Sequence, residues 1–251
     1  MSRSNSDLSV IIITKDEEQN IERCLKSLPE GCDIVVVDSG SNDKTVAIAK
    51  SFGCRVFTRK FTNFAEQKNY ALEQAHGNWV LSMDADEELV GVDSVADLTP
   101  KETTSEAFRI CRKLSFMGKT LGFGKTKDAP VRLFKSGVGR FENPIHERFA
   151  VPSNPGKIRA NIHLIHYSYK DLTDYFLRFN RYTSQIAQNH LEKNRRIPLL
   201  HLVLRPWFEF IIRYILRLGF LDGYPGYCYA LISSHYAFIK FAKLKELRER
   251  Q

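Results

Sequence analysis

Three short polar segments in the first 90 residues carry side chains that could hold a phosphate group or a metal ion. They are residues 14–17 (Thr-Lys-Asp-Glu), 38–43 (Asp-Ser-Gly-Ser-Asn-Asp) and 84–88 (Asp-Ala-Asp-Glu-Glu). Each segment alone could be a helix N-cap or a turn, because Asp, Ser and Asn are favoured there. Three acidic segments at one sheet edge would repel one another unless a cation or specific hydrogen bonds offset their charge. The set therefore favours a ligand site.

The pair Asp84 and Asp86 is the most informative part of this set. Carboxylates two residues apart, just past a strand, can point to one side, and hard oxygen ligands suit Mg²⁺ or Mn²⁺. Magnesium is usually bound by one or two carboxylates together with substrate phosphates. The expected ligand is therefore a nucleoside diphosphate that is bridged by the metal. An Asp-x-Asp motif also occurs by chance, but this one follows the apolar run 79–83 and two earlier acidic segments.

An alternation of strands and helices should position these segments. Apolar runs predict strands at residues 8–13, 33–37, 55–58 and 78–83. Helical spacing of apolar residues predicts helices at residues 17–28, 43–52 and 64–75. This alternation is typical of a parallel sheet with right-handed crossovers, in which ligands bind outside the carboxyl ends of the strands. We therefore predict an α/β fold in which the three acidic segments meet at one sheet edge.

In the remainder of the chain the predicted secondary structure changes twice, first to short strands and then to helices. Short strands are predicted at 107–111, 130–135 and 161–167, separated by loops that contain Gly and Pro. Helices are predicted at 171–194, 199–218 and from 224 to the end. We expect a catalytic domain at 1–170 and a helical extension at 171–251.

Charge is distributed unevenly between these two parts. The net charge is +8, yet residues 1–150 carry 21 Lys and Arg against 22 Asp and Glu, while residues 151–251 carry 16 against 7. This asymmetry favours an anionic partner for the second part, either nucleic acid or an acidic membrane surface. The overall composition, 43% hydrophobic and 26% charged, excludes a disordered or low-complexity chain.

The C-terminal pattern favours a membrane surface over nucleic acid. Arg205, Glu209, Arg213 and Arg217 recur every four residues within an apolar and aromatic segment, which is typical of an amphipathic helix in a membrane interface. The aromatic residues lie within apolar runs and not among spaced basic residues, so no nucleic acid partner is expected. A buried helix or a homo-oligomer interface is the alternative. No membrane-spanning segment or signal peptide is expected, because charged residues and Pro206 interrupt the most apolar region, 199–221.

Cysteine spacing and glycine motifs exclude several other classes. The five cysteines are scattered without a Cys-x-x-Cys pair, which argues against a zinc ribbon or a secreted disulfide scaffold and fits a reducing cytoplasm. The Gly-Lys-Thr triplets at 118–120 and 124–126 lack the earlier glycine that a phosphate loop requires. No Gly-x-Gly-x-x-Gly follows the first strand, which disfavours a dinucleotide-binding enzyme.

Three longer stretches resemble a known family. VIIITKDEEQNIERCLKSL, DIVVVDSGSNDKT and FAEQKNYALEQAHGNWVLSMDADEEL are similar to the nucleotide-sugar domain of the family 2 glycosyltransferases. The spacing further resembles lipopolysaccharide core-biosynthesis β-glucosyltransferases, as do PVRLF (130–134), NPIHE (143–147) and GFLDG (219–223). The resemblance implies a GT-A fold, a Rossmann-like and mostly parallel sheet flanked by helices, which here carries a C-terminal helical extension. It also implies a UDP-sugar donor, Mg²⁺ or Mn²⁺, and inversion at the anomeric carbon.

The resemblance assigns roles to individual residues on the nucleotide side. Thr14 and Glu17 would hold the uridine and its ribose. Asp38 would accept a hydrogen bond from the uracil or ribose, and Asp43 would shape that pocket. Lys68 would lie near the base and phosphates, where arginine is more common in the family.

The same resemblance assigns roles near the reacting groups. Asp84 would contact the ribose or the sugar, and Asp86 would coordinate the metal. Glu147 is the best candidate for the general base that an inverting transfer requires, and Asp128 is a weaker one. His146 would contact the diphosphate or the metal.

Two of these assignments have plain structural alternatives. Arg132 would contact the diphosphate, or it could be an exposed strand charge. Glu147 could instead pair with Arg148 or Arg140 on the surface.

The resemblance suggests UDP-glucose as donor and a sugar of the lipopolysaccharide inner core as acceptor. The enzyme would act in the cytoplasm, peripherally on the inner face of the cell membrane, with an anionic membrane surface as partner. One alternative is transfer to another lipid-linked or protein acceptor. The other is a catalytically silent, membrane-bound scaffold that retains the nucleotide pocket.

Overall fold

A computed structural model describes residues 6–101, 103–143, 147–195 and 198–250. The chain forms two compact units. Unit 1 comprises Met1–Arg112 and Asp128–His166, and unit 2 comprises Lys113–Lys127 and Tyr167–Gln251. Residues 113–127, which the sequence analysis placed in the catalytic domain, therefore pack with the C-terminal helices.

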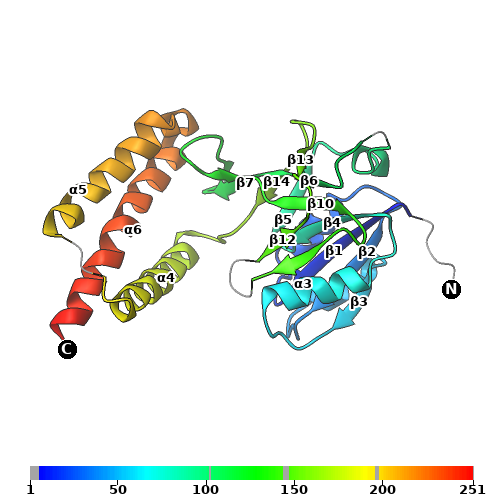
Figure 1. The fold of residues 1–251 in the computed structure, drawn as a ribbon, viewed down its shortest axis with the longest axis horizontal. Coiled ribbons are helices and arrows are strands. Elements are labelled where there is room, and N and C mark those ends of the chain that lie inside the picture. The colour runs from blue at the N-terminus through cyan, green and yellow to red at the C-terminus, as the bar shows by residue number, and fades with distance from the viewer. Residues whose placement is uncertain (1–5, 102, 144–146, 196–197, 251) are drawn as a thin grey trace. The chain divides into compact units, whose positions relative to one another are not determined.

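A seven-stranded sheet forms the centre of unit 1 (Figure 1). In spatial order its strands are β13 (Gly156–Lys157), β6 (Ala107–Arg109), β10 (Val131–Lys135), β4 (Trp79–Asp84), β1 (Leu8–Thr14), β2 (Asp33–Asp38) and β3 (Arg55–Thr58). Strands β4, β1, β2 and β3 are parallel, whereas β10 is antiparallel to both of its neighbours. The expected α/β fold with a mostly parallel sheet is confirmed.

Both faces of this sheet are covered because side chains of successive strand residues point to opposite faces. Val10 and Ile12 of β1 pack in one buried cluster with residues of α1 (Ile21–Lys26) and α2 (Thr45–Ser51). Ile11 packs in a second cluster with residues of α3 (Phe64–Glu73). The continuous apolar runs predicted from the sequence are thus buried on both sides, as expected for parallel strands.

Two short strand pairs complete unit 1 near the candidate site. β5 (Glu87–Val90) pairs antiparallel with β14 (His163–His166), and β11 (Arg140–Glu142) pairs with β12 (Arg148–Ala150). Phe149 of β12 stacks on Phe134 of β10, with ring centroids 3.6 Å apart and planes at 9°. This stacking seats the β11–β12 pair on the main sheet. A single 3₁₀ turn, η1 (Val95–Asp97), follows β5 in the chain.

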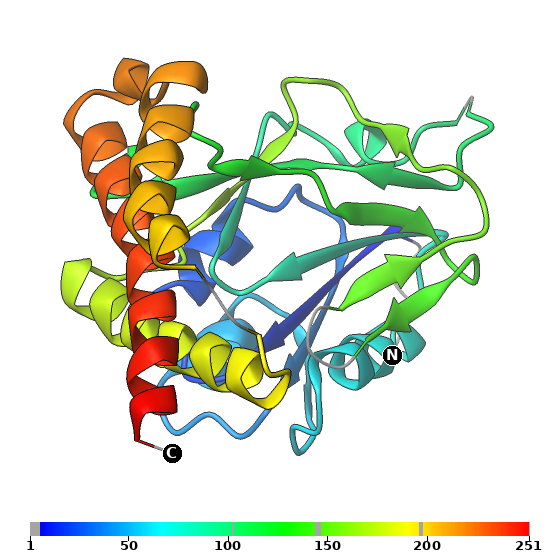
Figure 2. The same ribbon diagram turned by 60° about the vertical axis from the view of Figure 1, so that its left-hand side comes forward.

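Unit 2 is built around three helices, with α5 packed along α6 and α4 packed across it (Figures 1 and 2). They are α4 (Leu172–Glu192), α5 (Leu199–Phe210) and α6 (Gly223–Glu249). The predicted helix at 199–218 is shorter than expected, because α5 gives way to a π-helical turn, η2 (Ile211–Leu216), and a 3₁₀ turn, η3 (Gly219–Asp222). No helix among the described residues is both long and apolar enough to span a bilayer.

The segment 113–127 is tied to these helices by Asp222. This segment contains most of β7 (Cys111–Phe116), β8 (Lys119–Thr120) and the start of β9 (Lys127–Asp128). The buried carboxylate of Asp222 accepts hydrogen bonds from the amides of Gly122 and Phe123, at 2.8–3.0 Å, and its carbonyl accepts from Lys119 Nζ at 2.8 Å. The GFLDG stretch is therefore structural in unit 2. Its neighbour Gly226 must lack a side chain, because a Cβ there would lie 2.2 Å from the carbonyl oxygen of Gly219.

The polar stripe predicted along 205–217 is turned partly inward. Glu209 is 8% exposed and accepts a hydrogen bond from Arg213 Nε at 2.8 Å, and Arg213 Nη1 also donates to the carbonyl of Gly124. Large apolar side chains face outward instead, with Trp207 69% and Leu216 68% exposed. Unit 2 thus presents an exposed apolar surface formed by Leu200, Val203, Trp207, Phe208, Leu216, Leu221 and Tyr224.

Candidate active site

The carboxyl ends of three parallel strands bring the acidic segments to one sheet edge. Thr14 is the register partner of Asp38 in the β1–β2 pair, and Ile13 is the register partner of Asp84 in the β1–β4 pair. The strand ends are therefore level with one another. The sequence-based expectation that these segments meet is correct, and it follows from the parallel register alone.

The first two segments are held together by hydrogen bonds between their side chains and backbone. The 2%-exposed Asp38 accepts from the amides of Gly40 and Ser41 at 2.9 and 3.0 Å. Asp43 accepts from the amide of Glu18 at 3.0 Å, and the amide of Glu17 donates to the hydroxyl of Thr45 at 2.8 Å.

One buried hydroxyl at this sheet edge takes no part in these hydrogen bonds. The buried hydroxyl of Thr14 has no hydrogen-bond partner within the described ranges. Buried polar atoms are rarely left unpaired. The structure thus holds the carboxylates of Asp38 and Asp43 and the backbone of Glu17 in a fixed frame, with the buried Thr14 hydroxyl beside them.

Asp84 lies at the centre of a charged network that joins three other predicted site residues. Its Oδ1 lies 2.9 Å from Lys68 Nζ, and its Oδ2 lies 2.7 Å from Arg132 Nη2. Lys68 Nζ also lies 2.9 Å from Oε1 of Glu147. Burial opposes ionisation of Asp84, but the charges of Arg132 and Lys68 and their hydrogen bonds hold its pKa well below the usual range. Asp84 is therefore a fixed carboxylate.

The structure contradicts the alternatives that the sequence left open for Arg132 and Glu147. Arg132 is not an exposed strand charge, because it is 5% exposed and contacts two carboxylates. Glu147 contacts buried Lys68, and within the described part of the chain it forms no ion pair with Arg148 or Arg140. Arg132 Nε is buried and unpartnered among the described residues, which leaves one donor for a ligand.

Glu87 and Arg112 belong to the same network and were not singled out as ligand-binding residues from the sequence. Glu87 is 1% exposed, lies 2.6 Å from Arg132 and 3.2 Å from Arg112, and accepts from the amide of Asp84 at 2.9 Å. Burial, with the charge of Asp84, raises the pKa of Glu87 despite the two arginines. Arg112 also binds Asp128 at 2.6 Å, so this weaker candidate for the base is engaged in an ion pair.

Asp86 points to a different partner, His166. His166 Nε2 lies 3.2 Å from Asp86 Oδ2, and β14 brings the histidine there by pairing with β5. Burial lowers the pKa of His166, but the hydrogen bond and charge of Asp86 outweigh it and raise that pKa above its ordinary value. Nothing in the sequence near Asp86 indicated His166, since the two residues are 80 positions apart.

This pair is the chemically suitable place for a divalent metal. The carboxylate is a ligand for both Mn²⁺ and Mg²⁺, the imidazole favours the transition metal Mn²⁺ over Mg²⁺, and substrate phosphates commonly complete the shell. No group of three or more His, Cys, Asp or Glu side chains suitable for a metal occurs among the described residues. A metal held by Asp86 and His166 would therefore need ligands from the substrate. His146, the other predicted metal contact, lies outside the described residues.

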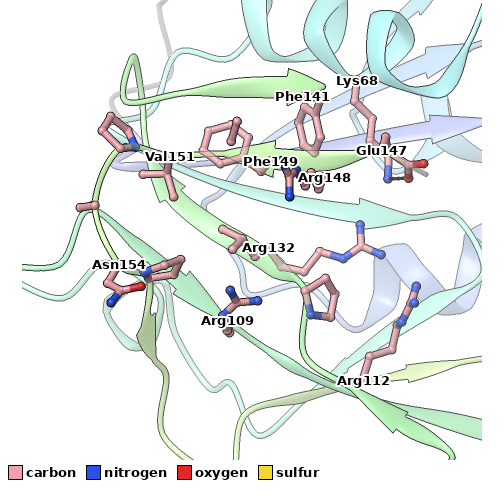
Figure 3. Close-up of a pocket in the computed structure, with 16 residues that line it drawn as sticks. Lys68, Arg109, Arg112, Arg132, Phe141, Glu147, Arg148, Phe149, Val151 and Asn154 are labelled. Atoms are coloured by element: carbon pink, nitrogen blue, oxygen red, sulfur yellow. Dashed lines mark hydrogen bonds and ion pairs between the residues drawn. The ribbon is translucent and has the colours of Figure 1, made fainter. Parts of the chain in front are cut away.

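An open pocket of about 680 Å³ adjoins the network (Figure 3). Lys68 and Glu147 lie along its wall together with Arg132 and Arg112. The rest of the lining comes from β6, β10, the β11–β12 pair and residues 151–155. The proposed base therefore faces a cavity large enough for a saccharide.

Comparisons with known proteins give the family and the fold that this chain resembles. Residues 9–90 match the sequence model of glycosyl transferase family 2. The lipopolysaccharide core biosynthesis glycosyltransferase LpsC of Rhizobium meliloti is 28% identical over 249 residues, which cover 94% of this chain and 91% of that protein. An uncharacterized glycosyltransferase of Rickettsia typhi is 27% identical, over 96% of this chain and 87% of its own.

A solved structure extends the likeness in fold to nearly the whole chain. The mannosyltransferase PcManGT of Pyrobaculum calidifontis, determined with GDP-Man and Mn²⁺, has a TM-score of 0.54 and 16% sequence identity. The alignment covers 95% of this chain and 86% of that one. The fold of the chain is therefore that of the GT-A glycosyltransferases. More particularly, the segment that contains the three acidic segments matches glycosyl transferase family 2, in agreement with the sequence resemblance.

Proposed function

We propose that this chain is an inverting, metal-dependent glycosyltransferase that moves a sugar from a UDP-sugar to a saccharide acceptor. The observation that carries the proposal is the contact of Lys68 with both Asp84 and Glu147. It places a carboxylate beside the strand end where nucleotide-sugar ligands are expected and beside an open pocket. An inverting transfer needs a base on the face of the anomeric carbon opposite the leaving group, and Glu147 is the carboxylate that we assign to this role.

In the proposed reaction Glu147 accepts the proton of the acceptor hydroxyl as its oxygen attacks the anomeric carbon. The new carbon–oxygen bond forms while the bond to the diphosphate breaks, and UDP leaves with the bonding electron pair. Lys68 positions the Glu147 carboxylate through the 2.9 Å contact. Arg132, held by Asp84 and Glu87, has its free Nε available for the diphosphate or the sugar.

The donor side of the site rests on the frame formed by the first two acidic segments. Thr14 and Glu17 would hold the uridine and its ribose, with Asp38 and Asp43 shaping that pocket. Asp86 and His166 would hold Mn²⁺ or Mg²⁺, and the Mn²⁺ in the related mannosyltransferase structure supports a divalent ion. When bound, such an ion neutralises charge that develops on the leaving diphosphate.

The acceptor and the location follow from the relatives and from unit 2. Similarity to LpsC supports a sugar of the lipopolysaccharide core as acceptor, with UDP-glucose as the proposed donor. The exposed apolar surface of unit 2 and the excess of basic residues after residue 151 support peripheral binding to an anionic membrane. The proposed location is the inner, cytoplasmic face of the cell membrane, where a lipid-linked acceptor would be reached. Self-association through the same apolar surface is the alternative.

Calorimetric titration of UDP, with and without Mn²⁺, into the wild type and Asp86→Asn tests the donor site. We expect metal-dependent UDP binding by the wild type and its loss in the variant. A panel of UDP-sugars then identifies the donor by release of UDP. Failure of UDP to bind under both conditions would overturn the proposal. Metal-dependent binding with no turnover on any acceptor would instead indicate a silent nucleotide-binding scaffold.

A further inference from the structure

The pocket beside Lys68 and Glu147 carries more positive charge than the catalytic network uses. Among its described lining residues, Glu147 is the one acidic side chain. The basic side chains that line it are Lys68, Arg109, Arg112, Arg132 and Arg148. A pocket that binds only neutral hydroxyl groups has no need of this excess.

Three of these cations are neutralised within the protein. Lys68, Arg112 and Arg132 each have a carboxylate within 3.2 Å. The carboxylates that they contact are Asp84, Glu87, Asp128 and Glu147. Three cations thus face four acidic groups, and this network has no spare positive charge for a ligand.

Arg109 and Arg148 differ from these three cations, because no carboxylate among the described residues neutralises them. Arg109 ends β6, is exposed, and donates one hydrogen bond to the carbonyl of Ala129 at 3.2 Å. Arg148 begins β12 and is exposed. Glu142 is its register partner on β11, but no ion pair joins them and Glu142 is absent from the pocket lining. In the part of the chain that the structure describes, neither arginine has a carboxylate partner.

Topology separates these two arginines from the nucleotide side of the sheet. The segments 14–17, 38–43 and 84–88 follow β1, β2 and β4, and none of their residues lines the pocket. Arg109 comes from β6, which lies on the other side of β4 from β1 and β2 in the sheet order, and Arg148 comes from the separate β11–β12 pair. In Figure 3 both are drawn between Asn154 and the Lys68–Glu147 end of the pocket.

We propose that this pocket binds an acceptor saccharide with an anionic substituent, a carboxylate or a phosphate, and that Arg109 and Arg148 recognise that substituent. Guanidinium groups match both anions through paired, charge-assisted hydrogen bonds. Recognition of the charge would place the neighbouring hydroxyl near Glu147. The inference rests on the proposed function, because it assigns this pocket to the acceptor.

Three probe saccharides that differ in one substituent test the inference. They are methyl glucoside, methyl glucuronide and methyl glucoside 6-phosphate, titrated into the full chain with UDP and Mn²⁺ present. The proteins compared are the wild type, Arg109→Gln, Arg148→Gln, the double variant and Arg140→Gln. Arg140 is an exposed arginine on β11 that does not line the pocket, so it controls for net charge. UDP affinity is measured on the same samples.

We expect one or both charged probes to bind the wild type about tenfold more tightly than the neutral one. The double variant should lose this preference, whereas Arg140→Gln should keep it and UDP affinity should stay unchanged in both. The ratio of the two charged probes distinguishes a carboxylate from a phosphate ligand.

Two results would overturn the inference. One is the absence of any charge preference, or its survival in the double variant. The other is weaker UDP binding in that variant, since the arginines would then serve the donor. Failure of UDP to bind the wild type would instead count against the proposed function, and the saccharide titration without UDP would still test the pocket.

Discussion

The ammonium nitrogen of Lys68 lies 2.9 Å from Oε1 of Glu147, although 79 residues separate the two in the chain. Lys68 is 2% exposed on α3, and the same nitrogen lies 2.9 Å from Asp84 at the end of β4. A buried ammonium is unfavourable unless it is paired, so the two carboxylates account for its burial. The lysine thereby joins the proposed base to the strand end on the donor side of the site.

Replacing Glu147 by Gln removes the proton acceptor and keeps the shape of the side chain. We expect kcat to fall by about 10²–10⁴-fold, the usual contribution of a general base, with UDP affinity unchanged. Steady-state release of UDP from the donor measures the rate. Glu73→Gln, an exposed position on α3, is the control and should keep full activity. If Glu147→Gln retained full activity, Glu147 would not be the base and Asp128 would be the remaining candidate.

Lys68 and Glu147 should act as one unit in catalysis. Lys68→Gln leaves Asp84 paired with Arg132 but releases the Glu147 carboxylate, so we expect kcat to fall by about tenfold or more. The double variant should be no slower than Glu147→Gln alone, because Lys68 has no carboxylate to position once Glu147 is replaced. A double-mutant cycle on kcat measures this coupling. Additive losses would show that the two residues serve separate steps.

The elements that position the donor side were predictable because they depend on local sequence. The runs that became β1, β2 and β4 are mostly apolar, with β-branched residues prominent in β1 and β2, and their parallel pairing follows from the alternation with helices. Arg112 and His166 could not be placed in this way. They reach the site through antiparallel pairings and ion pairs between distant segments, which have no periodicity to reveal them.

The sequence also did not predict which side chains of the C-terminal helices turn inward. Four-residue spacing predicted a polar stripe, but spacing does not reveal which side of a helix faces the protein. Glu209 and Arg213 turned inward because they pair with each other and Arg213 reaches the carbonyl of Gly124. Apolar residues near them in the chain, such as Trp207 and Leu216, are exposed instead.

Acid should weaken unit 1 through Asp33. This carboxylate accepts two hydrogen bonds from Arg55 at 2.8 Å and one from Ser9 at 2.8 Å. Burial raises the pKa of Asp33, but these bonds and the Arg55 charge outweigh it and lower that pKa. A lowered folded pKa gives stability that is present above the unfolded value near about 3.9 and is lost as pH falls through the folded value.

Asp33→Asn should therefore lower the free energy of unfolding by about 1–2 kcal/mol at pH 7, and by less as the pH falls below about 4. Urea denaturation across this pH range measures the difference. Asp93→Asn is the control, because the Asp93 carboxylate forms no ion pair or hydrogen bond within the described residues. A loss for Asp33→Asn that does not change with pH would contradict the assignment to ionisation.

Asp222 should stabilise unit 2 without taking part in transfer. Its carboxylate is the acceptor for two backbone amides of the loop at 122–123, and Ala would leave both amides unpaired. We expect Asp222→Ala to lower the stability of unit 2 by about 1–3 kcal/mol. Hydrogen exchange at residues 113–127 and in α6 should increase while exchange in β1 and β2 stays constant. Increased exchange throughout both units would argue against this local role.

The exposed apolar surface of unit 2 should bind anionic membranes, and the two tryptophans of the chain allow a direct test. Trp207 is 69% exposed in this surface, whereas Trp79 is 4% exposed in the core of unit 1. Vesicles of phosphatidylcholine with phosphatidylglycerol should shift the fluorescence of the wild type to shorter wavelength, since Trp207 enters an apolar environment. Trp207→Phe should bind equally well without the shift, because Trp79 is already buried.

Negative charges introduced into the apolar surface of unit 2 should weaken vesicle binding itself. Trp207→Glu with Leu216→Glu removes two large apolar contacts, each worth about 1.5–3 kcal/mol when fully buried, so co-sedimentation should fall by more than about tenfold. Phe52→Glu, which changes an exposed aromatic residue of unit 1, should bind vesicles as the wild type does. Sedimentation velocity without vesicles separates the alternative: a wild-type dimer that the double variant converts to a monomer would assign this surface to self-association.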